Sequence, residues 1–100
     1  MTRPTAETHA RIQEEIAREK AAALGRAGER LEATLAAVRA LASAWHAADA
    51  GGRERLGREY HEAWRAADAA RLALLIQREA VGLRDARVVD AQFPMPPRRP

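Results

Sequence analysis

His46, Asp49 and His61 have side chains of the types that bind transition metals, and they lie on either side of the clearest turn signal in the chain. Two imidazoles and one carboxylate are a common ligand set for zinc or iron. The helical pattern, however, places His46 at the edge of an apolar stripe and His61 on a polar face. We therefore expect ordinary, partly exposed histidines. The Glu-x-x-His motif of di-iron helical bundles is also absent, so no metal or cofactor is predicted.

Nucleophilic catalysis has little to work with in this sequence. Ser43 is the only serine, and no neighbouring base is positioned to activate its hydroxyl. The chain has no cysteine, which excludes a thiol nucleophile and disulfides and fits a reducing compartment. The first seven residues contain no apolar run of a signal peptide, and no stretch approaches the roughly 18 apolar residues of a membrane span. We expect a cytoplasmic protein that is not an enzyme and has no membrane partner.

Arginine is the main basic residue of this chain, with 16 of the 17 basic side chains, and arginines are typical of nucleic-acid surfaces. Residues 1–50 carry seven basic and seven acidic side chains, and residues 51–100 carry ten and seven. Two of the three surplus charges are Arg98 and Arg99 near the end of the chain, so the body is almost balanced. Nucleic-acid binders usually concentrate their basic residues in one patch. Weak binding through Arg53, Arg55, Arg58 and the end of the chain is therefore only an alternative hypothesis.

The apolar residues repeat with a helical period over most of the chain, which predicts an all-α fold. The first helix is expected at about residues 6–49, opened by Pro4 and Thr5. The residues that fall on one side of it, its apolar stripe, are Ile12, Ile16, Ala23, Leu24, Ala27, Leu31, Thr34, Val38, Leu41, Trp45 and Ala48. From Ala17 through Leu24, Leu31 and Val38 to Trp45 the spacing is seven residues each time, as in a coiled coil.

Gly25 and Gly28 interrupt this stripe, and each glycine costs about 1 kcal/mol inside a helix. One interpretation is a break in the helix, which would give a three-helix bundle. The other is a continuous helix whose glycines let another helix approach closely. The stripe stays in phase on both sides of the glycines, which favours the continuous helix.

The sequence Asp49-Ala50-Gly51-Gly52 predicts a turn at residues 50–52, with a glycine ending the first helix. A second helix is expected at about residues 53–81, and a short third helix at about residues 86–92, after Gly82 and with Asp85 as its cap. Because a short loop joins antiparallel neighbours, the two long helices should form a hairpin. Residues 1–93 are thus expected to form a single helical domain.

The later part of the second helix is apolar all round. Leu72, Ile76 and Leu83 lie on the face opposite its main stripe. A helix with two apolar sides needs cover on both, and a hairpin covers only one. The chain's own end, a second copy, or both are the candidates. We expect a homodimer with a four-helix core, and an additional, unidentified protein partner is compatible with this surface.

Leu72, Ile76 and Leu83 are the predicted association interface, with Arg71 and Arg78 at its edge, whereas Trp45 and Trp64 are predicted to take part in helix packing. Arg71 and Arg78 lie at the edge of the apolar stripe, where they would extend into water or pair with Glu19, Glu32 or Glu79 in preference to binding an anion. Trp45 and Trp64 are expected to pack at the turn end of the hairpin. A small-ligand pocket between helices stays a further alternative, but no residue pattern names its chemistry.

Residues 94–100, Pro-Met-Pro-Pro-Arg-Arg-Pro, cannot form a helix because proline fixes φ and lacks an amide N–H. We expect an extended tail. A proline-rich peptide with arginines is a typical docking ligand, although a frayed terminus is the more common outcome.

The sequences Glu-Lys-Ala-Ala-Ala-Leu-Gly-Arg-Ala-Gly (residues 19–28) and Gln-Arg-Glu-Ala-Val-Gly-Leu-Arg-Asp (77–85) resemble a family of small proteobacterial all-helical proteins of unknown function. The resemblance extends from Glu19 to about Phe93. It implies a bacterial origin and a helical fold, and no activity or ligand. The arginine and proline ending departs from the Ile-Pro type of ending in that family.

Overall fold

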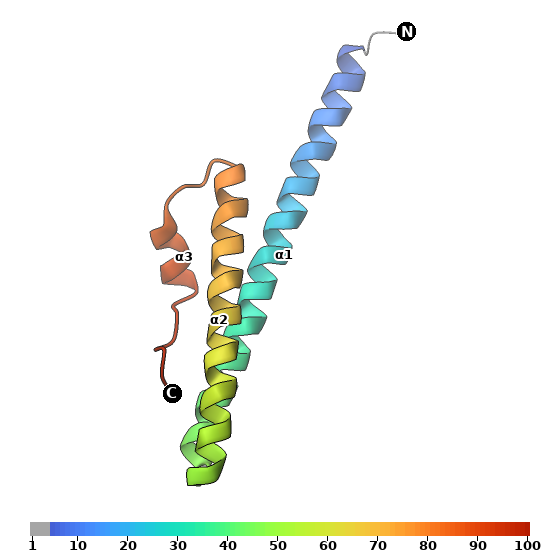
Figure 1. The fold of residues 1–100 in the computed structure, drawn as a ribbon. Helices are drawn as coiled ribbons and strands as arrows, with labels where there is room; N and C mark the ends of the chain where they lie inside the picture. The colour runs from blue at the N-terminus through green and yellow to red at the C-terminus, as the bar shows by residue number, and fades with distance from the viewer. Residues whose placement is uncertain (1–4) are drawn as a thin grey trace.

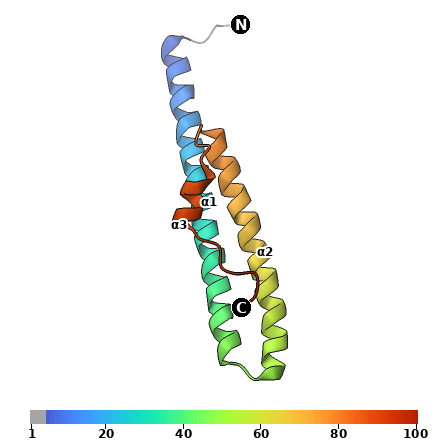
Figure 2. The same ribbon diagram turned by 90° about the vertical axis from the view of Figure 1, so that its left-hand side faces the viewer.

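The structure is a computed structural model that describes residues 5–100. Three helices, α1 (Ala6–Ala47), α2 (Ala50–Ala80) and α3 (Ala86–Gln92), are joined by short connections, and the described range contains no strand. α1 and α2 form an antiparallel hairpin, and α3 folds back beside α2 (Figures 1 and 2). The predicted all-α class, with two long helices and a short third one, is confirmed. The predicted role of Pro4 lies outside the described residues.

α1 begins at a side-chain cap and continues without a break. The Thr5 hydroxyl accepts a hydrogen bond from the Thr8 backbone N–H at 3.2 Å, which satisfies one of the free N–H groups of the first turn. The helix then runs through Gly25 and Gly28 to Ala47, so the continuous interpretation was right. The alternative, a three-helix bundle made by a break at these glycines, was wrong.

The turn of the hairpin lies earlier than predicted. Ala48 and Asp49 form it, and Gly51 and Gly52 already belong to the first turn of α2. The physical reason is that the Asp49 carboxylate accepts a hydrogen bond from the Gly52 N–H at 2.8 Å and so starts the helix. Neither glycine has a positive φ, so neither ends α1 in the way that we expected.

α2 ends at a glycine, as the sequence indicated. Gly82 has a φ of +86°, which only glycine adopts without strain. Its N–H donates to the Glu79 carbonyl at 3.0 Å, and the Leu83 N–H donates to the Arg78 carbonyl at 2.9 Å, a pair of bonds that closes the helix. Asp85 then caps α3 by accepting from the Arg87 N–H at 3.0 Å.

The core lies in the middle of the hairpin and takes residues from all three helices. Its members are less than a tenth exposed and are Leu31, Leu35 and Val38 of α1, Tyr60, Ala67, Ala70 and Leu74 of α2, and Val89 of α3. Phe93 and Met95, which follow α3, pack against the same cluster. The third helix is therefore a structural part of the core.

The molecule is long and thin, with extents of 70 × 27 × 15 Å. At 1.5 Å per residue, α1 is about 63 Å long and α2 about 46 Å. α1 ends at the turn and α2 begins there. Because α1 is the longer helix, its first part extends past the end of α2 (Figure 1). None of the described helices combines the length and the apolar content needed to cross a membrane.

Candidate functional site

One side of the later part of α2 is apolar and largely exposed. We call this surface the outer face, and its residues are Ala69, Leu72, Ala73, Ile76 and Ala80. Leu72 is 50% exposed and Ile76 is 65% exposed, whereas Leu74 between them is only 5% exposed. Residues two apart on a helix point to nearly opposite sides, so Leu72 and Ile76 point away from the side that Leu74 buries. Leu83, just after the helix, is 46% exposed.

α3 covers a different flank of α2. Its Val89 is buried in the core, and its Asp90 forms an ion pair with Arg71 of α2 at 2.8 Å. Arg71 and Leu75 are half-buried there, while Leu72 and Ile76 stay exposed. The chain's own end was one of two candidates for covering the outer face, the other being a second copy. It packs on another flank of α2 and leaves the outer face exposed.

The beginning of α1 is a second uncovered surface. We call residues 6–22 the overhang, and every residue from His9 to Ala22 is exposed. Ile12 and Ile16 are 46% and 45% exposed, so the apolar stripe of α1 continues beyond the part that the hairpin covers. The cause is the difference in helix length, because α2 ends before it reaches them. That signal was present in the predicted helix lengths.

The two arginines beside the core do not pair as expected. Arg71 pairs with Asp90 of α3, and Glu19 pairs with Arg26 at 3.2 Å, so the pairings with Glu19, Glu32 and Glu79 were wrong. The Nε of Arg78 is buried and has no hydrogen-bond partner among the described residues. The nearby positive charge of Arg78 contributes to a pKa of Asp85 below its usual range, after the larger effect of hydrogen bonds from Arg87.

The two glycines of α1 are not contact points within the chain. A Cβ built at Gly25 or at Gly28 would meet no other atom within 4 Å. The prediction that these glycines let another helix approach closely was therefore wrong for the helices of this chain. The unbroken helix carries both glycines without using the space that they leave.

The two tryptophans have different places. Trp45 lies at the turn end, where the Arg53 guanidinium carbon sits 4.6 Å from the centre of its ring and the Arg53 Nε–H donates to the Trp45 carbonyl at 3.1 Å. Trp64 lies farther along α2, where it packs against the core cluster and not at the turn end. Its indole Nε1–H instead donates to the Pro96 carbonyl at 2.8 Å.

The tail is extended, and it packs along α2. Besides the Trp64 bond, the Tyr60 hydroxyl donates to the Pro97 carbonyl, and the Arg98 guanidinium carbon lies 4.8 Å from the Trp64 ring centre. Burial also raises the pKa of the Tyr60 phenol. The expectation of a frayed terminus was wrong. No signal near the prolines in the sequence indicates these two donors, which lie more than 30 residues earlier.

The candidate metal ligands and the arginines of the nucleic-acid hypothesis remain to be placed. Within residues 5–100, no three His, Asp or Glu side chains come together as a metal site requires, so His46, Asp49 and His61 form no such group. Arg55 and Arg58 pair with Glu59 and Glu54 at 3.1 and 3.5 Å. With Arg53 engaged by Trp45, the three arginines of α2 in the nucleic-acid hypothesis have partners inside the chain.

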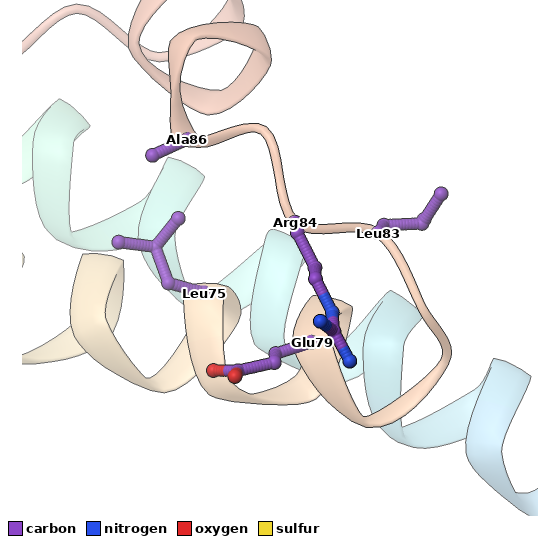
Figure 3. Close-up of a pocket in the computed structure, with 5 residues that line it drawn as sticks. All are labelled: Leu75, Glu79, Leu83, Arg84 and Ala86. Carbon is purple, nitrogen blue, oxygen red and sulfur yellow. The ribbon is translucent and has the colours of Figure 1, made fainter.

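A pocket of about 260 Å³ lies where α2 passes into α3. Its lining is Leu75, Glu79, Leu83, Arg84 and Ala86 (Figure 3). The figure shows that Leu75 and Glu79 project from α2, whereas Leu83 and Arg84 come from the connection to α3. One acid and one arginine at the edge of an apolar hollow name no ligand class.

No protein-family model, curated protein or solved structure matches this chain. The resemblance to a proteobacterial family therefore stays a prediction.

Proposed function

We propose that the protein is a non-enzymatic helical module that works by association, first with a second copy of itself, and that the outer face of α2 is the centre of that contact. The observation that carries the proposal is the exposure of Leu72 and Ile76 at 50% and 65% after α3 and the tail have packed elsewhere. Complete burial of a large aliphatic side chain stabilises by about 1.5–3 kcal/mol. Covering both side chains would thus contribute a useful part of a dimerisation free energy.

The total exposed surface supports an association of this kind. The chain exposes 7454 Å², whereas a compact monomer of 11.0 kDa is expected to expose about 5,600 Å². Its radius of gyration is 19.6 Å, against about 13 Å for a compact domain of 100 residues. The excess surface, about 1,800 Å², exceeds the ~800 Å² that each partner buries in an interface of standard size.

A second copy fits this surface because both uncovered patches belong to the same end of the hairpin. In a dimer with two-fold symmetry, each patch of one copy meets a patch of the other. An antiparallel arrangement can place Ile12 and Ile16 of one overhang against the outer face of the partner. Ala69, Ala73 and Ala80 are small enough for a neighbouring helix to come within the usual 8–10 Å between axes.

The charges of the two patches are compatible with that arrangement. Residues 6–22, the overhang, carry four acidic and three basic side chains, and residues 69–80, the part of α2 that bears the outer face, carry one acidic and two basic ones. The patches therefore have opposite net charges and would not repel each other. The absence of cysteine is consistent with our further proposal that the protein works in the cytoplasm.

Light scattering after size exclusion tests the proposal. Wild type at high micromolar concentration should have twice the 11.0 kDa mass of the chain. The double variant Leu72→Asp/Ile76→Asp should have the monomer mass, because two carboxylates would be buried in the contact.

A matched control exists on α1. Ala36 and Ala40 are exposed and flank the buried Val38 in the way that Leu72 and Ile76 flank Leu74. Ala36→Asp/Ala40→Asp adds the same charge and should stay dimeric. A monomeric wild type at high micromolar concentration would contradict the proposal, and so would equal masses for the two double variants.

A further inference from the structure

The tail meets α2 mainly through backbone carbonyls. Trp64 donates its indole N–H to the Pro96 carbonyl, and Tyr60 donates its hydroxyl to the carbonyl of the next residue, Pro97. Tyr60 and Trp64 are four residues apart and lie on the same side of α2, one helical turn from each other. The tail therefore runs antiparallel to α2, and two consecutive carbonyls receive two aromatic donors.

Proline explains why donors are needed on the helix side. A proline has no N–H, so the backbone of Pro96 and Pro97 offers only acceptors, and its fixed φ holds the segment extended before it binds. Domains that recognise proline-rich peptides use aromatic grooves and benefit from this low entropy cost. Tyrosine and tryptophan suit the task because each combines an apolar ring with one polar donor.

The side chains of the segment add two further contacts. Met95, before the two prolines, and Phe93, at the end of α3, pack against the core cluster. After the prolines, the Arg98 guanidinium carbon lies 4.8 Å from the Trp64 ring centre, within the range of a cation–π contact. The contacts thus depend on an apolar residue, two prolines and an arginine in this order.

From these contacts we infer that Tyr60 and Trp64 form a recognition site for extended, proline-rich, arginine-bearing peptides, and that the tail is its resident ligand. The occupant in trans is a Pro-Pro-Arg segment of a partner protein, which must displace the tail to bind. This site faces away from the exposed Leu72 and Ile76, because Tyr60 belongs to the buried side of α2. It is independent of self-association through the outer face.

The contacts distinguish recognition from simple covering. A segment that only covers the core needs apolar side chains, which Phe93 and Met95 supply. The two hydrogen bonds to backbone carbonyls are directional and fix the path of the segment along α2. Selectivity for sequence comes from the prolines, which hold the segment extended, and from the arginine on the Trp64 ring. Arg99, next to Arg98, has no ion pair or hydrogen bond within the described residues. The comparison of Arg98 with Arg99 therefore separates an arginine that contacts Trp64 from one that does not.

The test uses the full chain with its tail weakened by Pro96→Gly, Pro97→Gly and Arg98→Ala. The synthetic peptide Phe-Pro-Met-Pro-Pro-Arg-Arg-Pro, which repeats residues 93–100, is added while the indole N–H resonance of Trp64 is followed. The resonance of Trp45, at the turn end of the hairpin, is the control in the same spectrum. We expect saturable binding that moves only the Trp64 signal.

Wild type should bind the same peptide at least tenfold more weakly, because a tethered competitor acts at an effective concentration in the millimolar range. Adding Trp64→Phe to the weakened chain keeps an apolar ring but removes the donor, and it should reduce peptide affinity at least fivefold. This affinity is measured by titration calorimetry, beside the weakened chain, because the variant lacks the Trp64 resonance. A peptide with alanine in place of its first arginine should also bind less well. If the triple variant does not fold, Arg98→Ala alone takes its place, with a smaller gain over wild type.

Three results would overturn the inference. One is the lack of saturable binding to the weakened chain. Another is an affinity that neither Trp64→Phe nor the alanine peptide changes, which would reduce the contact to unspecific covering. The third is a Trp64 resonance in wild type that depends on protein concentration, because it would assign the site to the tail of a second copy instead of a partner protein.

Discussion

One flank of α2 is covered by the rest of the chain, and the other is exposed. On one flank, α3 and the tail supply Val89, an aspartate for Arg71 and two carbonyls for Tyr60 and Trp64. On the other flank, Leu72 and Ile76 keep half or more of their surface exposed. Both flanks carry large apolar side chains, so apolarity alone does not decide which one is covered. α3 and the tail pack along only one flank.

The comparison is tested most strongly by two leucines of α2 that are two residues apart. Leu74→Ala should lower the free energy of unfolding by about 2–5 kcal/mol, because it leaves a cavity in the core. Leu72→Ala should cost less than about 1 kcal/mol in dilute solution, because the side chain is already half in water. Urea unfolding at low and high protein concentration measures both effects.

At high concentration the Leu72→Ala cost should increase, since association stabilises the folded chain by mass action and the variant loses part of it. Leu74→Ala should show little further change. Equal costs for the two variants in dilute solution would mean that both flanks are covered in the lone chain.

The next effect concerns the covered flank and its dependence on pH. Burial raises the folded-state pKa of Tyr60, while the unfolded phenol ionises near pH 10. The stabilising contribution is therefore complete below about pH 10 and is lost as pH rises through the folded-state pKa. Tyr60→Phe should cost about 1 kcal/mol at neutral pH and should lack this part of the alkaline loss. Unfolding curves from pH 8 to 11 for both proteins check it.

A smaller effect is expected from the ion pair that joins α3 to α2. Arg71 is mostly buried and Asp90 half-exposed, so a double-mutant cycle to alanine should give a coupling of about 0.5–1 kcal/mol. The Arg55–Glu59 pair on the surface of α2 is the control, and its coupling should be about 0.3–0.5 kcal/mol. A coupling of zero for Arg71 and Asp90 would mean that this ion pair does not stabilise the contact between α3 and α2.

The smallest effect should appear in acid at the start of α3. Hydrogen bonds from the Arg87 side chain and backbone, together with the charge of Arg78, hold the pKa of Asp85 below its usual range. The unfolded carboxyl ionises near pH 3.9, so the cap contributes fully above that value and is lost as pH falls through the folded-state pKa.

Methyl resonances of Val89 report this loss between pH 5 and 2. They should shift with a midpoint below pH 3.9 in wild type, and Asp85→Asn should lack that transition. An identical acid profile in both proteins would show that ionisation of the Asp85 cap does not hold α3 in place.

Local signals in the sequence account for most of the fold. The apolar period predicts both long helices, and the phase of the stripe across Gly25 and Gly28 predicts that α1 is continuous. Gly82 and Asp85 act where their types indicate, because a left-handed glycine and a capping carboxylate depend only on neighbouring residues. The turn was misplaced because Asp49 and the two following glycines give competing signals, and the aspartate starts α2 before a glycine ends α1.

The parts that could not be predicted depend on distant segments. The prolines of the tail exclude a helix, yet nothing near them in sequence predicts contact with Tyr60 and Trp64, more than 30 residues earlier. The exposed Leu72 and Ile76 could be named as a candidate surface, whereas the flank chosen by α3 could not.

The most direct measurement for the outer face is the reactivity of a single thiol. Because the chain has no cysteine, Ile76→Cys and Ala40→Cys each introduce one unique thiol at an exposed helical position. The rate of modification by a thiol reagent is measured from low to high micromolar protein concentration. We predict that the thiol at position 76 reacts more slowly as concentration rises while the thiol at position 40 does not change. Equal rates at all concentrations for both thiols would contradict self-association through this face.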